Sequence, residues 1–253
     1  MSPAVIVIPA RLHSTRLPRK LLLADTGRTV LQHTYEAACR ARRASQVIVA
    51  TDDQQIVDVA QSFGATAVMT DPEAASGTDR VAELARRGVD AEVLVNVQGD
   101  EPEIDPAAID LAIEMMDDPT VPMATLATPI RSLDQVRAPS CVKVVCDARG
   151  DALYFSRSVI PHVRDGLEEA FAAGEVTFLQ HLGLYAYRRD FLLQLGQLPP
   201  SPLEKLEKLE QLRVLHAGYR IRVGTVQHSA AGIDTPADYA AFVDRWRHRQ
   251  AGR

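Results

Sequence analysis

The stretch Val5-Ile-Val-Ile-Pro-Ala-Arg-Leu-His-Ser-Thr-Arg-Leu-Pro-Arg-Lys20 joins an apolar run to a basic loop. Its first four residues are all β-branched and show no polar alternation, which is typical of a strand buried on both faces of a parallel sheet. Pro9 is expected to end this strand. The first expectation for the fold is therefore an open α/β sheet with this strand near its centre.

Three cations and two hydroxyls follow on the loop, those of Arg11, Ser14, Thr15, Arg16 and Lys20. Ligands of open α/β sheets bind beyond the carboxyl ends of the strands, and arginine and lysine are the usual partners of phosphate oxygens. The loop therefore predicts a polyphosphate site, with a solvated basic turn as the alternative. Neither glycine-rich phosphate motif is present, so side chains would do most of the binding.

The composition is that of an ordinary globular protein, with 253 residues, 46% of them hydrophobic and 24% charged. A net charge of -5 disfavours nucleic-acid binding. The three cysteines have no C-x-x-C spacing, which argues against a zinc site or a disulfide framework and favours a reducing cytoplasm. The N-terminal apolar run is too short for a signal peptide or a membrane span.

The first hundred residues alternate strand and helix patterns. Helices are expected over 30–44 and 54–63, and strands over 46–51 and 66–69, which with the first strand gives the order β-α-β-α-β. That order implies parallel strands with right-handed crossovers. The next loop contains Ser76 and Gly77, which could approach a ligand closely, although Ser76 or Thr78 could equally be a plain helix cap.

A second informative segment is Val93-Leu-Val-Asn-Val-Gln-Gly-Asp-Glu-Pro102. Its buried strand ends at Gln98, and Asp100 then emerges at the carboxyl edge of the sheet, opposite the basic loop. A hard cation such as Mg²⁺ takes one or two carboxylates together with phosphate oxygens. Because Asp105 can cap the next helix, 106–116, Asp100 is not needed for capping and is a candidate metal ligand.

The pattern changes between residues 123 and 188. Strands are expected over 123–128, 142–147, 152–156 and 182–187, with a hairpin turn at 147–150. Short connections imply antiparallel pairing, so this region is expected to form a small antiparallel annex and to be a suitable place for dimer contacts. Arg157, His181 and Tyr185 are its polar residues that could reach a ligand, although a lone histidine beside a strand is more often structural.

The last part of the chain is expected to contain one buried helix, a strand and a final helix. The helix would run from the Ser201 cap to residue 217, with leucines on most sides. Glu210 would face a packed side and need a partner there, with a snorkelling acid at the helix surface as the alternative. The strand is expected over 221–226 and the final helix over 236–246. Asp234, just before that helix, is a second candidate metal carboxylate that could share one ion with Asp100.

The assembled segments closely resemble the 3-deoxy-manno-octulosonate cytidylyltransferases, also called CMP-Kdo synthetases, from Ile8 to about Asp238. The segments that carry the resemblance are Ile8-Pro-Ala-Arg with Ser14-Thr-Arg-Leu-Pro-x-Lys20, Val49-Ala-Thr-Asp52, Ser76-Gly-Thr-Asp-Arg80, Val95-Asn-Val-Gln-Gly-Asp-Glu-Pro102, Val142-Lys-Val-Val145, Ala152-Leu-Tyr-Phe-Ser-Arg157, His181-Leu-Gly-Leu-Tyr185, Pro200-Ser-Pro-Leu-Glu204, Leu209-Glu-Gln-Leu-Arg213 and Gly232-Ile-Asp-Thr-Pro236. Each segment alone is weak, but together and in this order they are highly specific.

The resemblance implies one nucleotidyltransferase domain over residues 1–253, of glycosyltransferase-A-like α/β type with a mostly parallel central sheet, and a homodimer. It implies that CTP and 3-deoxy-D-manno-octulosonate (Kdo) give CMP-Kdo and pyrophosphate, with Mg²⁺, for lipopolysaccharide biosynthesis. By motif, the resemblance implies that Arg11, Ser14 and Lys20 hold the triphosphate, that Ser76 and Gly77 lie at the cytosine and ribose, and that Asp100 and Asp234 bind the metal. The residues that it implies for the sugar acid are Gln98, Arg157, His181, Tyr185, Glu210 and Gln211, with Arg157 facing the Kdo carboxylate.

Two positions depart from the family pattern. Position 19 is Arg where the family usually has Gly, and position 180 is Gln where a basic residue usually precedes the histidine. The first bears on the conformation of the loop and the second on the charge near the sugar acid. Two kinds of alternative remain. The substrate could be an 8-amino relative of Kdo or another sugar acid, or the protein could be a catalytically silent nucleotide-sugar binding protein on the same fold.

Overall fold

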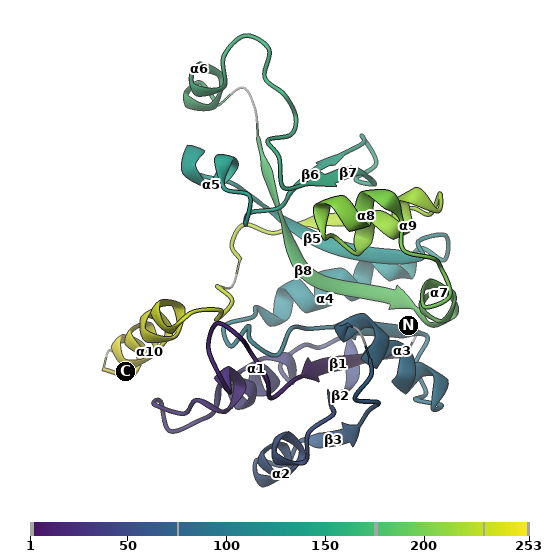
Figure 1. The fold of residues 1–253 in the computed structure, drawn as a ribbon, viewed down its shortest axis with the longest axis vertical. Coiled ribbons are helices and arrows are strands. Elements are labelled where there is room, and N and C mark those ends of the chain that lie inside the picture. Colours follow the sequence, from purple (N-terminus) through teal and green to yellow (C-terminus); the bar gives the residue numbers. More distant parts are fainter. Residues whose placement is uncertain (1–2, 75, 175–176, 230, 252–253) are drawn as a thin grey trace.

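The computed structural model describes residues 3–74, 76–174, 177–229 and 231–251, and a nine-stranded sheet organises them (Figure 1). The strands of the first half are parallel and lie in the order β3-β2-β1-β4. Their bounds are β1 Ala4–Ala10, β2 Ala44–Thr51, β3 Thr66–Met69 and β4 Val93–Asn96. The helices between them are α1 Val30–Ala38, α2 Gln54–Ser62 and α3 Gly77–Arg86, with the short helix η1 at Lys20–Leu22.

The strand order reverses direction at β1. The chain moves outward from β1 to β2 and β3, and then returns to place β4 on the other side of β1. A crevice therefore opens beyond the carboxyl ends of β1 and β4, which is where ligands bind in sheets of this kind. The predicted basic loop follows β1, and Asp100 follows β4.

The second half of the chain extends the same sheet. The remaining elements are α4 Pro106–Glu114, η2 Met115–Asp117, β5 Met123–Pro129, α5 Leu133–Arg137, β6 Lys143–Cys146, β7 Ala152–Ser156, α6 Leu167–Ala172, β8 Leu179–Arg188, α7 Arg189–Leu195, α8 Pro202–Glu207, α9 Gln211–His216, β9 Arg222–Thr225 and α10 Pro236–Ala251. Within the path β3-β2-β1-β4-β8-β5-β9 the only antiparallel strand is β8. The predicted α/β class with a mostly parallel central sheet is confirmed.

The antiparallel region is smaller than the sequence indicated. The predicted hairpin turn is confirmed, since Gly150 N–H donates to the Asp147 carbonyl at 3.0 Å and β6 pairs with β7. However, β5 and β8 lie inside the central sheet, so only the β6–β7 hairpin branches from it (Figure 1). The reason is that β8 takes partners distant in sequence, β4 and β5, which local connection lengths do not indicate.

Both faces of the sheet are covered, which explains the unbroken apolar run at the N-terminus. Ile6 and Ile8 pack into a core with α1, α4 and α10, whereas Val5 and Val7 pack into a second core with α3, α7 and α9. All four side chains are at most 2% exposed. The prediction of a strand buried on both faces is therefore confirmed.

Pro9 does not end the first strand, contrary to the prediction. β1 continues to Ala10, and Pro9 lies opposite Ala50 of β2. Pairing with β4 stops at Val7, so Pro9 has a partner strand on only one side. Proline is tolerated where one side of a strand is unpaired, because its missing N–H then costs the sheet no more than one hydrogen bond.

Two helix predictions were also wrong in extent. The helix expected over 30–44 ends at Ala38, and the chain enters β2 at Ala44. The single helix expected over 201–217 is two short helices, α8 and α9, separated by Lys208, whose backbone is left-handed with φ 54°. As a result Leu206 is 81% exposed while Leu209 is only 7% exposed.

Side chains from β7 and its extension hold this break. The Glu207 carboxylate accepts hydrogen bonds from Ser156 Oγ at 2.7 Å and from the Arg157 backbone N–H at 2.9 Å. The Arg157 guanidinium in turn donates to the carbonyls of Glu207 and Lys208, at 2.7 and 3.4 Å. These tertiary contacts outweigh the local tendency of the leucine-rich segment to continue as one helix.

Side-chain caps begin several helices, and those predicted at Asp105 and Ser201 are confirmed. Thr29, Asp53 and Asp105 each accept a hydrogen bond from a backbone N–H in the first turn of the following helix, and Ser201 forms a capping box with Glu204. None of the helices in the described ranges combines the length and the apolar character that crossing a bilayer requires.

Candidate active site

An ion cluster joins three segments at the carboxyl edge of the sheet. The Lys20 ammonium lies against the Asp100 carboxylate, and it donates to Asp234 Oδ1 at 3.0 Å and to the Ile233 carbonyl at 2.9 Å. Burial alone would lower the pKa of Lys20, but the hydrogen bonds and charges of the two carboxylates outweigh it and raise the pKa. The structure thus brings together two predicted metal ligands and a predicted phosphate ligand.

Local backbone geometry sets this cluster in place. Arg19 adopts the left-handed conformation, with φ 56°, immediately before Lys20 begins η1. Glycine reaches this conformation most readily, which accounts for the usual family residue at position 19. Gly99 lies so close to β1 that a Cβ atom there would be 3.1 Å from the Pro9 carbonyl oxygen, so its missing side chain lets Asp100 approach the β1 loop.

The donor set of the cluster fits Mg²⁺. Asp100 and Asp234 already converge on one cationic group, the Lys20 ammonium. Within the described ranges no group of three or more His, Cys, Asp or Glu side chains could hold a metal ion. Two carboxylates are what Mg²⁺ commonly takes from a protein when phosphate oxygens and water complete its shell, whereas a metal site formed by protein ligands alone would need more.

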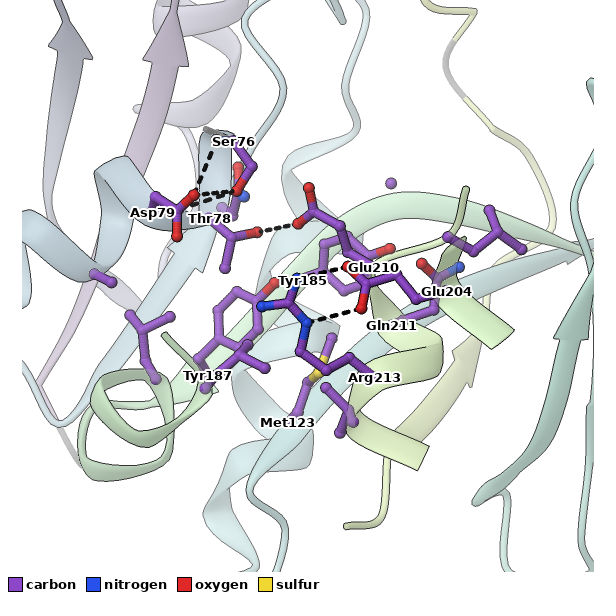
Figure 2. A pocket seen from close by; sticks show the side chains of 18 of the residues that line it. Ser76, Thr78, Asp79, Met123, Tyr185, Tyr187, Glu204, Glu210, Gln211 and Arg213 are labelled. Carbon is purple, nitrogen blue, oxygen red and sulfur yellow. Dashed lines mark hydrogen bonds and ion pairs between the residues drawn. The ribbon is translucent and has the colours of Figure 1, made fainter. Parts of the chain in front are cut away.

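A cavity of about 800 Å³ opens at the same edge of the sheet, with Arg11 from the loop after β1 and Gln98 from the segment after β4 in its lining. Figure 2 shows side chains of its walls. Of the predicted site residues, those that line it are Arg11, Ser76, Gly77, Gln98, Arg157, His181, Tyr185, Glu210 and Gln211. Ser14 shares the β1 loop with Arg11 but is not among the lining residues. Lys20, Asp100 and Asp234 form the adjacent ion cluster, and Asp100 is two residues beyond Gln98.

The N-terminus of α3 and the loop before it form one wall of the cavity. Ser76 caps α3 in a reciprocal arrangement with Asp79: its Oγ accepts from the Asp79 N–H at 3.2 Å, and its own N–H donates to the Asp79 carboxylate at 3.0 Å. The capping alternative for Ser76 is thus real, and it coexists with the position of Ser76 on the cavity wall. A Cβ at Gly77 would lie 3.3 Å from Pro9 Cγ, so this glycine allows α3 to start close to β1.

The sheet forms the floor, where β8 bulges. The register of β8 against β5 shifts between Thr125 and Leu126, next to Gly183, and such bulges often re-aim side chains at active sites. Thr125 Oγ1 lies 3.0 Å from His181 Nε2. Burial lowers the pKa of His181 from 6.5 to about 3, so this imidazole is neutral at physiological pH and acts as a hydrogen-bonding group, not as a cation.

Arg157 lines the cavity but is already engaged. Its Nε and both terminal nitrogens donate to the carbonyls of Glu207, Pro139 and Lys208. A guanidinium has five N–H donors, so two remain for a ligand. Arg157 therefore fixes the junction between α8 and α9 and can offer a carboxylate only its remaining donors.

Gln180, the other departure from the family pattern, lies on β8 opposite Thr128 and Lys143.

The α8–α9 segment forms the opposite wall. Glu210 accepts a hydrogen bond from Thr78 Oγ1 at 3.3 Å, across the cavity from α3 (Figure 2). The sequence argument that Glu210 needs a partner is thus met, and burial beside the cavity raises the pKa of its carboxyl group. Arg213 holds Glu204 with two hydrogen bonds, at 2.9 and 2.5 Å.

Sequence reasoning missed several lining residues, including Asn96, Thr78, Tyr187, Lys208 and Arg213. Asn96 carried a usable signal, because it is a polar residue inside an apolar strand. Thr78 was considered as a hydrogen-bond donor or a helix cap, but it was not assigned to the site. Tyr187 and Arg213 gave no local signal, since their neighbours in the cavity come from distant segments.

The α/β sheet with its switch point, the basic loop after β1 and the carboxylates beyond β4 define a nucleotidyltransferase. The family described as Cytidylyltransferase matches residues 5–221. The chain belongs to the 3-deoxy-manno-octulosonate cytidylyltransferase family, as its similarity to members from several bacteria shows.

Three relatives illustrate how far the similarity extends. The Geobacter metallireducens 3-deoxy-manno-octulosonate cytidylyltransferase is 48% identical, over 94% of this chain and 96% of its own, and that of Rhodopirellula baltica is 50% identical, over 95% and 97%. A solved structure of CMP:2-keto-3-deoxy-manno-octonic acid synthetase in complex with CTP is 44% identical, with a TM-score of 0.91, covering 98% of this chain and 100% of that one.

Proposed function

We propose that this protein transfers the cytidylyl group of CTP to Kdo, giving CMP-Kdo and pyrophosphate for lipopolysaccharide biosynthesis. The observation that carries the proposal is the convergence of Lys20, Asp100 and Asp234 at the switch point, beside a cavity lined by the residues that the family motif assigns to nucleotide and sugar acid. Family membership over nearly the whole chain supports the choice of CTP and Kdo.

The reaction joins the anomeric oxygen of Kdo to the α-phosphorus of CTP. That bond forms as the bond from the α-phosphorus to the bridging oxygen breaks, pyrophosphate leaves with the bridging oxygen, and the hydroxyl proton is lost. The protein's part is positioning and charge neutralisation, as is general for such transfers. In our proposal Arg11, Ser14 and Lys20 hold the triphosphate and neutralise the charge that grows on pyrophosphate.

Two groups of residues orient the remaining parts of the substrates. Ser76 and Gly77 contact the cytosine and the ribose. The residues proposed for the sugar acid are Gln98, Arg157, His181, Tyr185, Glu210 and Gln211. Because His181 is neutral, we assign it hydrogen bonds to sugar hydroxyls, and the Kdo carboxylate is left to the two free donors of Arg157.

Asp100 and Asp234 are the residues that would hold Mg²⁺. When bound, the ion polarises the α-phosphate and lowers the pKa of the attacking hydroxyl. The Lys20 ammonium, which contacts both carboxylates, is positioned to meet the phosphates at the same place.

The proposal includes a cytoplasmic homodimer. A cytoplasmic location agrees with the cysteine pattern. The β6–β7 hairpin is our candidate for dimer contacts, because it branches from the sheet and carries Leu153, which is 63% exposed.

The decisive experiment measures pyrophosphate release with Mg²⁺ and Kdo in the presence of CTP, ATP, GTP or UTP, and with CTP and 8-amino-Kdo. Release with CTP and Kdo only supports the proposal. Release with the 8-amino compound alone would keep the chemistry and change the substrate. CTP binding without release from any sugar acid would indicate a catalytically silent binding protein.

A further inference from the structure

Asn96 is a buried polar residue at the end of a central strand. It is the last residue of β4, it is 1% exposed, and it lines the cavity. No hydrogen-bond donor reaches its Oδ1 atom within the part of the chain that the structure describes. The family motif gave this residue no role.

An unpaired buried acceptor is costly and uncommon, so it needs an explanation. The side chains around Asn96 do not supply a donor to Oδ1: Val7 is its neighbour on β1, and Tyr185 lies opposite it on β8. A donor carried by a bound ligand would remove the cost. The same cavity contains a second buried atom, Nε2 of Gln211, that finds no partner among residues 3–74, 76–174, 177–229 and 231–251.

Two neighbours of Asn96 lie in the part of the cavity assigned to the nucleotide. The Asn96 Nδ2 atom is 3.7 Å from the position that a Cβ would take on Gly77, at the start of α3. It also precedes the candidate metal ligand Asp100 by only four residues, at the same end of β4. Gly77 and Asp100 belong to the wall and edge assigned to the nucleotide, whereas Tyr185, opposite Asn96 on β8, is assigned to the sugar acid, so Asn96 lies where the two parts of the cavity meet.

We propose that Asn96 accepts a hydrogen bond from a ribose hydroxyl of the nucleotide and thereby selects ribonucleotides over deoxyribonucleotides. The inference rests on the proposed function, in that CTP is the nucleotide. A triphosphate at neutral pH offers no donors, so the partner must be another group. The ribose is bonded directly to the α-phosphate, so it is the part of the nucleoside that lies nearest to Asp100.

The test compares CTP with 2′-deoxy-CTP and 3′-deoxy-CTP, by turnover with Kdo and by calorimetric binding, in the wild type and in Asn96→Ala. We expect the wild type to prefer CTP over one of the deoxynucleotides by about tenfold, the effect of one well-placed hydrogen bond. In Asn96→Ala that preference should fall close to one, while the KM for Kdo stays within about twofold.

Gln98→Ala is the matched control, because Gln98 lines the same cavity two residues further along the chain and is assigned to the sugar acid. It should raise the KM for Kdo and keep the preference for CTP over deoxy-CTP. The thermal midpoint of each variant reports whether it is folded.

Three results would overturn the inference. Equal use of CTP and both deoxynucleotides by the wild type does so even if the Asn96 variant does not fold. Loss of discrimination between CTP and UTP in Asn96→Ala would assign the oxygen to the cytosine amino group, and a raised KM for Kdo alone would assign it to the sugar acid. Failure of the wild type to bind or use CTP would instead contradict the proposed function.

Discussion

The Lys20 ammonium contacts two carboxylates that the chain supplies from β4 and from the segment before α10. Each carboxylate thereby has a cationic partner in the free protein. Removing the charge of one carboxylate leaves the other to neutralise the ammonium, so the fold should tolerate the change. The reaction should not tolerate it, because in our proposal the Mg²⁺ ion that stabilises the α-phosphate needs both carboxylates as ligands.

Asp100→Asn should therefore lower kcat by about 100-fold or more and leave CTP binding measurable, since Arg11 and Lys20 remain. Steady-state pyrophosphate release and calorimetry with CTP make the comparison. Asp105→Asn is the matched control, because Asp105 only caps α4 and asparagine caps a helix equally well. Near-normal turnover in Asp100→Asn would remove Asp100 from the metal site.

His181 should make the protein less stable as the pH falls. Its folded pKa of about 3 lies below its ordinary value of 6.5, so the unfolded chain binds the proton more readily. The stability that depends on neutral His181 is full above pH 6.5 and is lost progressively below it. Between about pH 7.5 and pH 5.5 the loss is about 1.4 kcal/mol.

His181→Gln cannot gain that proton, so its stability should fall by about 1.4 kcal/mol less than the wild type over the same pH interval. Urea denaturation at the two pH values measures the difference, and it cancels the contributions of other groups. Equal losses in the two proteins would mean that His181 is accessible to protons in the folded state.

For single residues, the sequence predicted which charged side chains gather at the sheet edge better than it predicted which hydrogen-bonding groups are already occupied. Asp100 could be singled out because a carboxylate after a strand and a glycine has few other uses, and in the structure it contacts Lys20. The engaged donors of Arg157 and the unpaired oxygen of Asn96 could not, since both depend on atoms from other segments.

Among the elements, the α8–α9 junction shows where local patterns fail. The Ser201 capping box was readable from sequence because all its parts lie within four residues. The break at Lys208 contains no glycine or proline that would indicate it in the sequence. Its left-handed backbone is held by Arg157, which follows β7 and donates hydrogen bonds to the Glu207 carboxylate and the Lys208 carbonyl. The break matters for function, because it turns Glu210 and Gln211 toward the cavity.

The sign of one substitution pair distinguishes a break from a continuous helix. Lys208→Gly and Lys208→Ala both remove the amine and its chain beyond Cβ, and only the glycine variant also lacks the Cβ. In a continuous helix the alanine variant would be more stable by about 1 kcal/mol. With φ at 54° we expect the reverse, the glycine variant being more stable by about 1 kcal/mol, because alanine is strained there. Urea denaturation of the two variants decides, and a more stable alanine variant would contradict the observed break.

Considered as a whole, the molecule assembles its site from both ends of the chain. The parallel half was predictable, because alternating strand and helix patterns allow few other arrangements. The insertion of antiparallel β8 between β4 and β5 was not, and neither was the meeting of Asp234 with Asp100, although the sequence raised that possibility. Both depend on how distant segments pack.

The helix that follows Asp234 is what returns it to the site. α10 lies beside α1 (Figure 1), where Phe242 is 2% exposed and packs edge-on against His33 with ring centroids 5.2 Å apart. Asp25 N–H donates to the Tyr239 hydroxyl at 2.9 Å, and the Ile233 N–H donates to the Asp100 carbonyl at the same distance. Docking of α10 and placement of Asp234 should therefore be coupled.

Phe242→Ala tests this coupling. The cavity it leaves should cost about 3–5 kcal/mol of stability and loosen α10, so that the Mg²⁺ concentration needed for half-maximal activity rises severalfold at a temperature where the variant is still folded. Phe191→Ala is the control, since Phe191 lies on α7 and is buried in the core on the other face of the sheet. Its loss should cost similar stability without changing the Mg²⁺ requirement. Titrations of pyrophosphate release with Mg²⁺ measure both variants. If both show the wild-type requirement, α10 contributes only stability and the position of Asp234 is set by the Lys20 loop, through the ion pairs that Arg16 and Lys20 make with it at 3.1 and 3.0 Å.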